Sequence, residues 1–165
     1  MENYTIPSAT RIGHIHLKVA DLERSLDFYC GLLGFELMQR MGDQAAFISA
    51  GGYHHHIGLN TWYSKEAPPA SPYGVGLFHT AIVYPERRDL ARIVLRLLEA
   101  DYQLTGASDH GVSEAIYLND PDENGVELYW DRPRKHWPVD AQGGLKMYTR
   151  PLDLQELIQT LNETT

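Results

Sequence analysis

Three residues of this chain have types and positions that suit a divalent metal ion: His14, His79 and Glu127. Each histidine stands near the start of an apolar, strand-like segment, and Glu127 lies inside another such segment between Val126 and Leu128. Burying a carboxylate costs on the order of several kcal/mol unless a partner compensates its charge. Two imidazoles and one carboxylate on one face of a metal leave the opposite positions open for reactants, as in non-haem Fe(II) oxygenases. We therefore expect these three side chains to form a metal site.

Each of these residues also has a plainer interpretation when it is taken alone. A glutamate in a strand usually faces solvent, because charged side chains are rarely buried without a partner. A single histidine in a strand is more often hydrogen-bonded scaffolding than a metal ligand. For His16, which shares a predicted strand face with His14, we prefer a role in lining the pocket. The metal hypothesis therefore depends on elements that bring the three residues together.

The chain contains the same order of elements twice: strand, helix, strand, strand, strand. The first copy has an alternating strand, a helix that Asp21 caps and Gly34 ends, a hairpin and a further strand. These elements of the first copy are expected at residues 11–19, 21–33, 35–40, 44–50 and 53–62. The corresponding elements of the second copy are expected at residues 77–84, 89–100, 102–106, 114–119 and 126–130.

The spacing of matching residues supports an internal repeat. His14 and His79 are 65 residues apart, and Gly58 precedes Glu127 by 69 residues. By this correspondence the first copy has a glycine where the second copy has its carboxylate. A repeated supersecondary unit that cannot bury both faces of its sheet alone is expected to pair with its neighbour.

The repeat predicts an α+β fold built from two tandem βαβββ modules. We expect these modules to pair into an open, half-barrel-like mixed sheet around a metal cavity, within a single domain that spans residues 1–165. The expected parts are module one at about residues 10–62, a proline-rich linker at 63–76, module two at about 77–132 and a C-terminal extension at 133–165. The extension contains a strand-like LKMYT and a final helix from about Leu152 to Leu161.

Composition excludes several classes of function. The chain has 165 residues and a formal net charge of -8, with no run of Lys or Arg, so nucleic acid and anionic membranes are unfavourable partners. No apolar run approaches the length of a membrane span, and the N-terminus lacks a signal-peptide pattern. The single cysteine, Cys30, excludes an internal disulfide and fits a reducing cytoplasm. We expect a cytoplasmic protein and, since twofold assemblies are the commonest, a homodimer.

Three segments resemble the vicinal oxygen chelate superfamily, which includes glyoxalases, bleomycin-resistance proteins and extradiol dioxygenases. The segments are GHIHLKVADLERSLDFYCGLLGFEL, FHTAIVYPERRDL and YLNDPDENGVELYWDRP. The resemblance covers about residues 10–137 and implies that His14, His79 and Glu127 occupy the metal positions. Glyoxalase I carries a fourth protein ligand where this chain has Gly58, so the resemblance favours a three-ligand site.

Within the superfamily, the chain most resembles the catechol-2,3-dioxygenase-like proteins. The segment FISAGGYHHHIGLN resembles the part of extradiol enzymes that carries a catalytic histidine, and the match falls on His55. Because alternation along a strand would point His55 away from the face of Gly58, this role requires a loop or bulge before Ile57. Tyr117, ten residues before Glu127, and His110 match further residues of the extradiol pocket. The resemblance thus implies His55, Tyr117 and His110 as catalytic residues.

The combined prediction is an oxidoreductase of aromatic catabolism that uses Fe(II) or Mn(II) and O2 to cleave the ring of a catechol-type diol. In that reaction a histidine would remove a phenolic proton, since its ordinary pKa lies near the operating pH. One alternative is a glyoxalase-like or glutathione-linked detoxifying enzyme with the same fold. The other is a metal-free protein that binds an aromatic compound or a drug.

Overall fold

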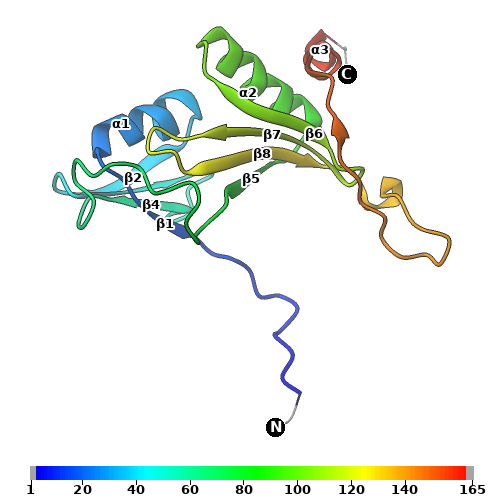
Figure 1. Cartoon of the computed structure of the whole chain (residues 1–165), viewed down its shortest axis with the longest axis horizontal. Coiled ribbons are helices and arrows are strands. Elements are labelled where there is room, and N and C mark those ends of the chain that lie inside the picture. Colours follow the sequence, from blue (N-terminus) through cyan, green and yellow to red (C-terminus); the bar gives the residue numbers. More distant parts are fainter. Residues whose placement is uncertain (1–2, 163–165) are drawn as a thin grey trace. The chain divides into compact units, whose positions relative to one another are not determined.

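A computed structural model of the chain describes residues 3–162 (Figure 1). The contacts between residues divide the chain into two compact units, here called unit 1, which ends at Ala67, and unit 2, which starts at Pro68. The boundary lies within the predicted linker, and each unit contains one of the predicted modules. Residues 3–14, which precede β1 (Ile15–Lys18), are exposed and form no helix or strand.

Unit 1 is a four-stranded sheet with one helical segment. Its strands have the order β1-β4-β3-β2, with β1 parallel to β4 and the other pairs antiparallel. The elements after β1 are α1 (Leu22–Leu26), η1 (Asp27–Leu32), β2 (Glu36–Met41), β3 (Ala45–Ser49) and β4 (Ile57–Asn60). The strands β3 and β4 are mostly buried, whereas β2 is exposed along its whole length.

The helix of unit 1 begins and ends where the sequence predicts. The Asp21 carboxylate accepts a hydrogen bond from the main-chain N–H of Arg24 at 3.1 Å, which caps the N-terminus. Gly34 follows the helix with a φ of +87°, a conformation that glycine adopts at little cost. The last turns, η1, are π-helical, which the apolar spacing did not predict, and Phe28 and Tyr29 are buried there.

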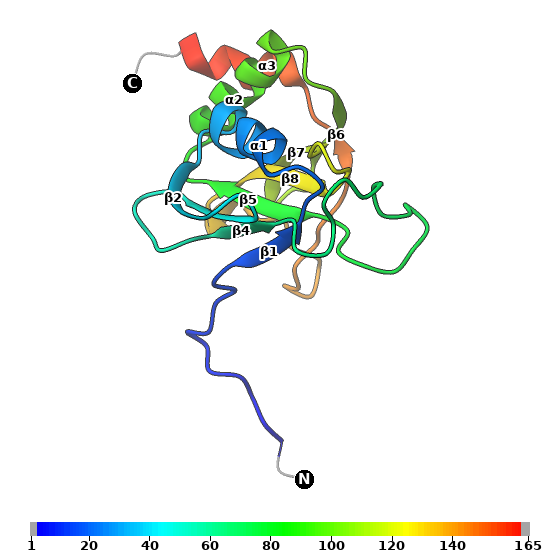
Figure 2. The same ribbon diagram turned by 90° about the vertical axis from the view of Figure 1, so that its left-hand side faces the viewer.

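Unit 2 contains the second sheet, with the strand order β5-β8-β7-β6-β9. Its elements are β5 (Thr80–Tyr84), α2 (Arg87–Glu99), β6 (Leu104–Asp109), β7 (Ser113–Asn119), β8 (Gly125–Asp131), η2 (Arg134–His136), β9 (Arg150–Pro151), α3 (Leu154–Gln159) and η3 (Thr160–Asn162). Helix α2 lies along one face of this sheet, and α3 packs beside α2 (Figures 1 and 2). No helix in residues 3–162 is long and apolar enough to span a membrane.

The two sheets confirm the predicted repeat and the α+β class. In each unit the first strand is parallel to the last strand of its βαβββ module, and the intervening pairs are antiparallel. Even an irregularity repeats: the pairing register shifts between Leu37 and Gln39 in unit 1 and between Leu104 and Gly106 in unit 2. The expected pairing of the modules around one cavity, the single domain and the homodimer stay predictions.

The strands expected from residues 11 and 77 begin later, at Ile15 and Thr80, and the strand expected at 102–106 lies at Leu104–Asp109. Two further segments differ more. The strand expected from Tyr53 begins only at Ile57, because Gly51 and Gly52 adopt positive φ angles and turn the preceding chain into a loop. LKMYT is not a strand: Leu145 makes an isolated bridge with Val139, and the edge strand β9 comes directly after LKMYT.

A buried carboxylate holds the C-terminal part of unit 2 together. Glu114 on β7 is 3% exposed, and its oxygens accept from Arg87 Nε and Arg132 Nη2, both at 2.6 Å. Arg132 also pairs with Asp109, and Arg87 pairs with Glu156 on α3. The hydrogen bond to Glu156 contributes most to the raised pKa of Arg87. Because removing one member of a buried ion pair leaves charge uncompensated, Glu114 is central to the stability of this unit.

We predict that Glu114→Gln lowers the free energy of unfolding by about 3 kcal/mol, measured by urea denaturation at neutral pH. The matched control is Glu23→Gln, which removes the ion pair between Glu23 and Arg40 on the surface of unit 1. Surface ion pairs contribute little, so the control is expected to unfold like the wild type. Equal stability of Glu114→Gln and the control would contradict this role for Glu114.

Candidate metal and catalytic site

In unit 2, two of the three predicted metal ligands lie in contact. His79 stands immediately before β5, and Glu127 pairs with Ala81 of β5 in the parallel register of β8. His79 Nε2 is 2.9 Å from Glu127 Oε2, and the Glu127 side chain is only 13% exposed. His79 Nδ1 is buried and has no hydrogen-bond partner among residues 3–162.

The pair has the chemistry and spacing of two neighbouring metal ligands. Donor atoms that lie about 2.1 Å from one cation, at a right angle to each other, are about 3 Å apart. An imidazole and a carboxylate together suit Fe(II), Mn(II) or Zn(II). In the part of the chain that the structure describes, no group of three or more His, Cys, Asp or Glu side chains is arranged to hold a metal ion. His79 and Glu127 therefore fit two ligand positions, and a third ligand stays a prediction.

Tyr117 and His110 extend this pair into a chain of hydrogen bonds. Tyr117 on β7 lies opposite Glu127 in the antiparallel register, and its hydroxyl is 3.2 Å from Glu127 Oε1. The same hydroxyl is 2.7 Å from Nε2 of His110. Burial, followed by the charge of Glu127, raises the pKa of Tyr117 to about 12, which keeps the phenol protonated at neutral pH. His79, Glu127, Tyr117 and His110 thus form one connected group.

Part of this group faces a cavity of about 910 Å³ in unit 2. His79 and Tyr117 line it together with the turn between β7 and β8 and the segment that begins at Pro69. Its apolar wall includes Pro69, Pro72, Val75, Leu77 and Phe78. A cavity with an apolar wall and a few polar groups is the usual form of a small-molecule site.

In unit 1, the remaining predicted ligand lies beside the predicted catalytic histidine. The ring centroids of His14 and His55 are 4.4 Å apart, and His55 lies in the loop before Ile57, as its proposed role requires. Of the neighbouring histidines, His56 bonds to Ser49 Oγ at 3.0 Å, whereas His54 Nδ1 lies 2.7 Å from His55 Nδ1. Burial, followed by the nearby His14, lowers the pKa of His55. His14 and His55 thus form a second group, which belongs to unit 1.

The strand registers explain why unit 1 has no counterpart of Glu127. Gly58 pairs with His16 on β1, just as Glu127 pairs with Ala81 on β5, and Ala81 follows His16 by 65 residues, the spacing of the repeat. A Cβ added to Gly58 would lie 2.8 Å from Cδ2 of His16, inside contact distance. The equivalent strand pairs therefore carry His16 beside Gly58 in unit 1 and Ala81 beside Glu127 in unit 2. In each pair a large side chain lies next to a small one.

Sequence analysis missed the partners of His110 in the C-terminal extension. The Nδ1 atom of His110 lies 3.2 Å from the main-chain oxygen of Tyr148 and 3.2 Å from Oγ1 of Thr149. A main-chain acceptor has no sequence signature, since every residue carries one. Thr149 lies in the segment predicted as a strand, which gave no reason to place it beside His110.

The model of the Glyoxalase/Bleomycin resistance protein/Dioxygenase superfamily matches residues 11–128. The catechol-2,3-dioxygenase of Bacillus subtilis (strain 168) is 39% identical over 155 residues, which make up 94% of this chain and 53% of that protein. The biphenyl-2,3-diol 1,2-dioxygenase 3 of Rhodococcus globerulus is 30% identical over 121 residues, covering 73% of this chain and 63% of that protein. The chain thus spans between half and two thirds of these relatives.

Glyoxalases are also similar to this chain. A lactoylglutathione lyase of Neisseria meningitidis is 26% identical over 126 residues, covering 72% of this chain and 88% of that protein. Among solved structures, a glyoxalase/dioxygenase from Nostoc punctiforme matches with a TM-score of 0.66 and 18% identity, covering 81% of this chain and 99% of that one. At this identity the structural match shows a shared fold and does not distinguish the activities.

The contact between His16 and Gly58 can be tested without any knowledge of the activity. We predict that Gly58→Ala lowers the free energy of unfolding by about 1–3 kcal/mol, because the new methyl group overlaps the His16 ring. Adding His16→Ala is expected to recover most of this loss, so the two effects are not additive. Gly31→Ala, where nothing lies within 4 Å of the new Cβ, is the matched control. Urea unfolding of Gly58→Ala, His16→Ala, the double variant and Gly31→Ala measures the coupling, and additive effects of the first two substitutions would contradict a contact between positions 16 and 58.

Proposed function

This chain belongs to the Glyoxalase/Bleomycin resistance protein/Dioxygenase superfamily, and we propose that it is a metal-dependent extradiol dioxygenase. Its substrates would be a catechol-type aromatic diol and O2. The main support for the proposal is a group of contacting side chains beside an apolar cavity. The group consists of His79, Glu127, Tyr117 and His110. The 39% identity to a catechol-2,3-dioxygenase over nearly the whole chain supports the same activity.

We propose His14, His79 and Glu127 as the residues that hold the metal, Fe(II) or Mn(II). When bound, such an ion would orient both reactants and neutralise negative charge that develops on the diol oxygens. The carboxylate of Glu127 supplies the protein's negative charge at the site, and β5 and β8 fix its distance from His79 through their parallel pairing. Gly58, the counterpart of Glu127, has no donor, so the proposed ligand set has three members.

The remaining side chains would bind the diol and move its protons. Tyr117 keeps its proton at neutral pH, and its hydroxyl oxygen can accept a hydrogen bond from a diol hydroxyl beside Glu127. His110 bonds to the Tyr117 hydroxyl and would set the direction of that proton. His55 would act as the base that removes a phenolic proton, and its place beside His14 is the contact expected of a base next to a ligand. The apolar part of the cavity wall suits an aromatic ring.

A glutathione-linked lyase is the second candidate because of the similarity to lactoylglutathione lyase. The pairing of Gly58 with His16 counts against it, since a carboxylate at position 58 would collide with the imidazole. The cavity lining also includes the acidic residues Asp122 and Glu123, which would repel the carboxylates of glutathione. A metal-free binding protein would have no need of the contact between His79 and Glu127.

The proposal predicts that protein loaded anaerobically with Fe(II) converts catechols to yellow ring-fission products when air is admitted. Tyr117→Phe, which removes the hydroxyl between Glu127 and His110, is expected to lower kcat by about 10²-fold while metal binding persists. The matched control is Tyr73→Phe, because the Tyr73 side chain is exposed and lies outside the cavity lining. Absorbance at the wavelength of the product measures both variants.

The outcomes separate the candidate functions. Metal-loaded protein that forms no ring-fission product across a panel of substituted catechols would contradict the dioxygenase proposal. Conversion of the hemithioacetal of methylglyoxal and glutathione by that same protein would support the lyase. Binding of an aromatic compound without any retained metal would support a metal-free binding protein.

A further inference from the structure

We propose that the C-terminal extension is part of the catalytic apparatus, because Tyr148 and Thr149 position His110. Their oxygens hold the imidazole proton on Nδ1, which leaves Nε2 to accept a hydrogen bond from the Tyr117 hydroxyl. Tyr148 and Thr149 are positioning residues in this account, since they act through His110. The catalytic consequence rests on the proposed dioxygenase function, whereas the position of the proton does not.

His110 and Tyr148 are bonded to each other in both directions. The main-chain N–H of Tyr148 donates to the main-chain oxygen of His110 at 3.3 Å. In return, Nδ1 of His110 lies 3.2 Å from the main-chain oxygen of Tyr148, and Oγ1 of Thr149 lies equally close. The main chain of His110 is itself fixed by a bond from its N–H to the oxygen of Ser113 at 2.9 Å. The ring therefore has a defined position between the β6–β7 turn and the extension.

The chemistry of the acceptor decides which ring nitrogen carries the proton. A carbonyl oxygen can only accept, so the bond between Tyr148 and His110 requires a proton on Nδ1. In a neutral imidazole the other nitrogen, Nε2, is then bare and can only accept. The nearest group to Nε2 is the Tyr117 hydroxyl at 2.7 Å, which must therefore donate its proton to His110.

This tautomer also decides whether Tyr117 donates a hydrogen bond to Glu127. The Tyr117 hydroxyl has one proton and two acceptors within reach, Nε2 of His110 at 2.7 Å and Oε1 of Glu127 at 3.2 Å. If Nε2 accepts this proton, the lone pairs of Glu127 Oε1 remain available for another partner. If the proton of His110 were on Nε2, the ring would donate to Tyr117, and the Tyr117 proton would turn towards Glu127. The extension thus sets the direction of a hydrogen bond that ends at the proposed metal ligand.

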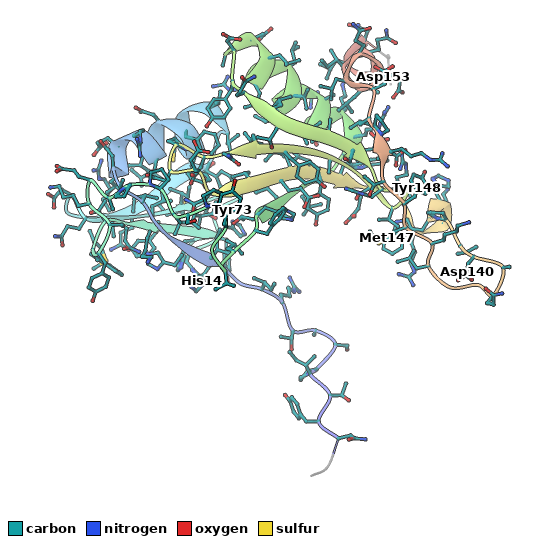
Figure 3. All side chains as sticks on the ribbon, in the orientation of Figure 1. His14, Tyr73, Asp140, Met147, Tyr148 and Asp153 are labelled. Carbon is teal, nitrogen blue, oxygen red and sulfur yellow. The ribbon has the colours of Figure 1, made fainter. Side chains whose placement is uncertain are left out.

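The extension is fixed tightly where it meets His110. Gly111 has a φ of +79°, and a Cβ added there would lie 2.7 Å from Cε1 of Tyr148 and 2.8 Å from Cγ of Pro138. The Arg150 guanidinium stacks over the Tyr148 ring, 4.4 Å from its centroid. Tyr148 lies where the extension reaches the end of the sheet, whereas Asp140 lies on the loop that projects from it (Figure 3). The glycine therefore makes room for the tyrosine.

Two further attachments hold the extension after Tyr148. Strand β9 pairs with β6, which places Arg150 opposite Asp109, next to His110. Helix α3 follows, and its Leu157 is fully buried while Glu156 pairs with Arg87 on α2. An element that only covered the sheet would not need to contact both Asp109 and Gly111, the residues on either side of His110.

The test is the protonation state of each ring nitrogen of His110, measured by nitrogen-15 NMR of the full chain. Spectra would be recorded at about pH 8.5, well above the ordinary histidine pKa of about 6.5, so that the ring is neutral. His110→Gln assigns the signals. In the wild type, we expect the proton on Nδ1 and a bare Nε2. A proton on Nε2 in the wild type would overturn the proposal.

Gly111→Ala displaces Tyr148 from His110, and Gly143→Ala is its matched control. Gly143 lies in the same extension with a φ of +81°, but nothing lies within 4 Å of an added Cβ there. We expect Gly111→Ala to move the His110 proton at least partly to Nε2 and Gly143→Ala to leave the wild-type signals. Thr149→Val is expected to shift the Nδ1 signal and to retain the tautomer, because the Tyr148 oxygen remains. Wild-type His110 signals in both Gly111→Ala and Thr149→Val would refute the proposal.

Turnover supplies a second readout in the Fe(II)-loaded full chain. We expect Gly111→Ala to lower kcat by about 10-fold or more with little change in KM, and Gly143→Ala to match the wild type. If no catechol is cleaved by any variant, the dioxygenase proposal fails. The NMR spectra still test, independently of turnover, whether the extension holds the His110 proton on Nδ1. If the wild type cleaves catechols and the tautomer changes without any loss of kcat, the catalytic role of the extension is wrong.

Discussion

Compensation of buried carboxylate charge is the constraint on which unit 2 depends. Its sheet carries two acids with little exposure, Glu114 on β7 and Glu127 on β8. Two guanidinium groups bond to Glu114, which makes it a structural centre that connects α2, β6 and α3. Glu127 instead contacts an imidazole and a phenol. An imidazole and a phenol are weaker partners for a carboxylate than two guanidinium groups, so Glu127 is suited to a bound cation.

The repeat shows how one βαβββ module can carry this acid and the other cannot. Equivalent strands place Gly58 and Glu127 at the same point of the two sheets. In unit 1 the His16 ring occupies the space beside Gly58, whereas in unit 2 the methyl group of Ala81 leaves room for a carboxylate. Each strand pair combines one large and one small residue, so packing is preserved in both units. Only the pair in unit 2 offers a carboxylate that could bind a metal.

Most of the fold could be predicted from the sequence, because strand alternation and helix caps are local signals and the repeat shows in the order of the elements. The sequence also selected His79 and Glu127 as neighbours in one site, and the contact between these two side chains follows from the pairing of β5 with β8. Local patterns missed the ion pairs of Glu114 and the bond between His110 and Tyr148, because these join residues far apart in the chain and one acceptor is main chain. They also missed the π-helical turns of η1, since apolar spacing does not distinguish these turns from α-helix.

If Glu127 and His79 together bind a divalent cation, the affinity of the protein for Mn(II), measured by calorimetry, depends on Glu127. The comparison is between the wild type, Glu127→Gln and Glu123→Gln, the last being an exposed acid in the neighbouring turn. The account predicts one site per chain in the wild type and in Glu123→Gln, and an affinity at least about 100-fold lower in Glu127→Gln. Equal affinities in all three proteins, or a wild type that binds no metal, would contradict it.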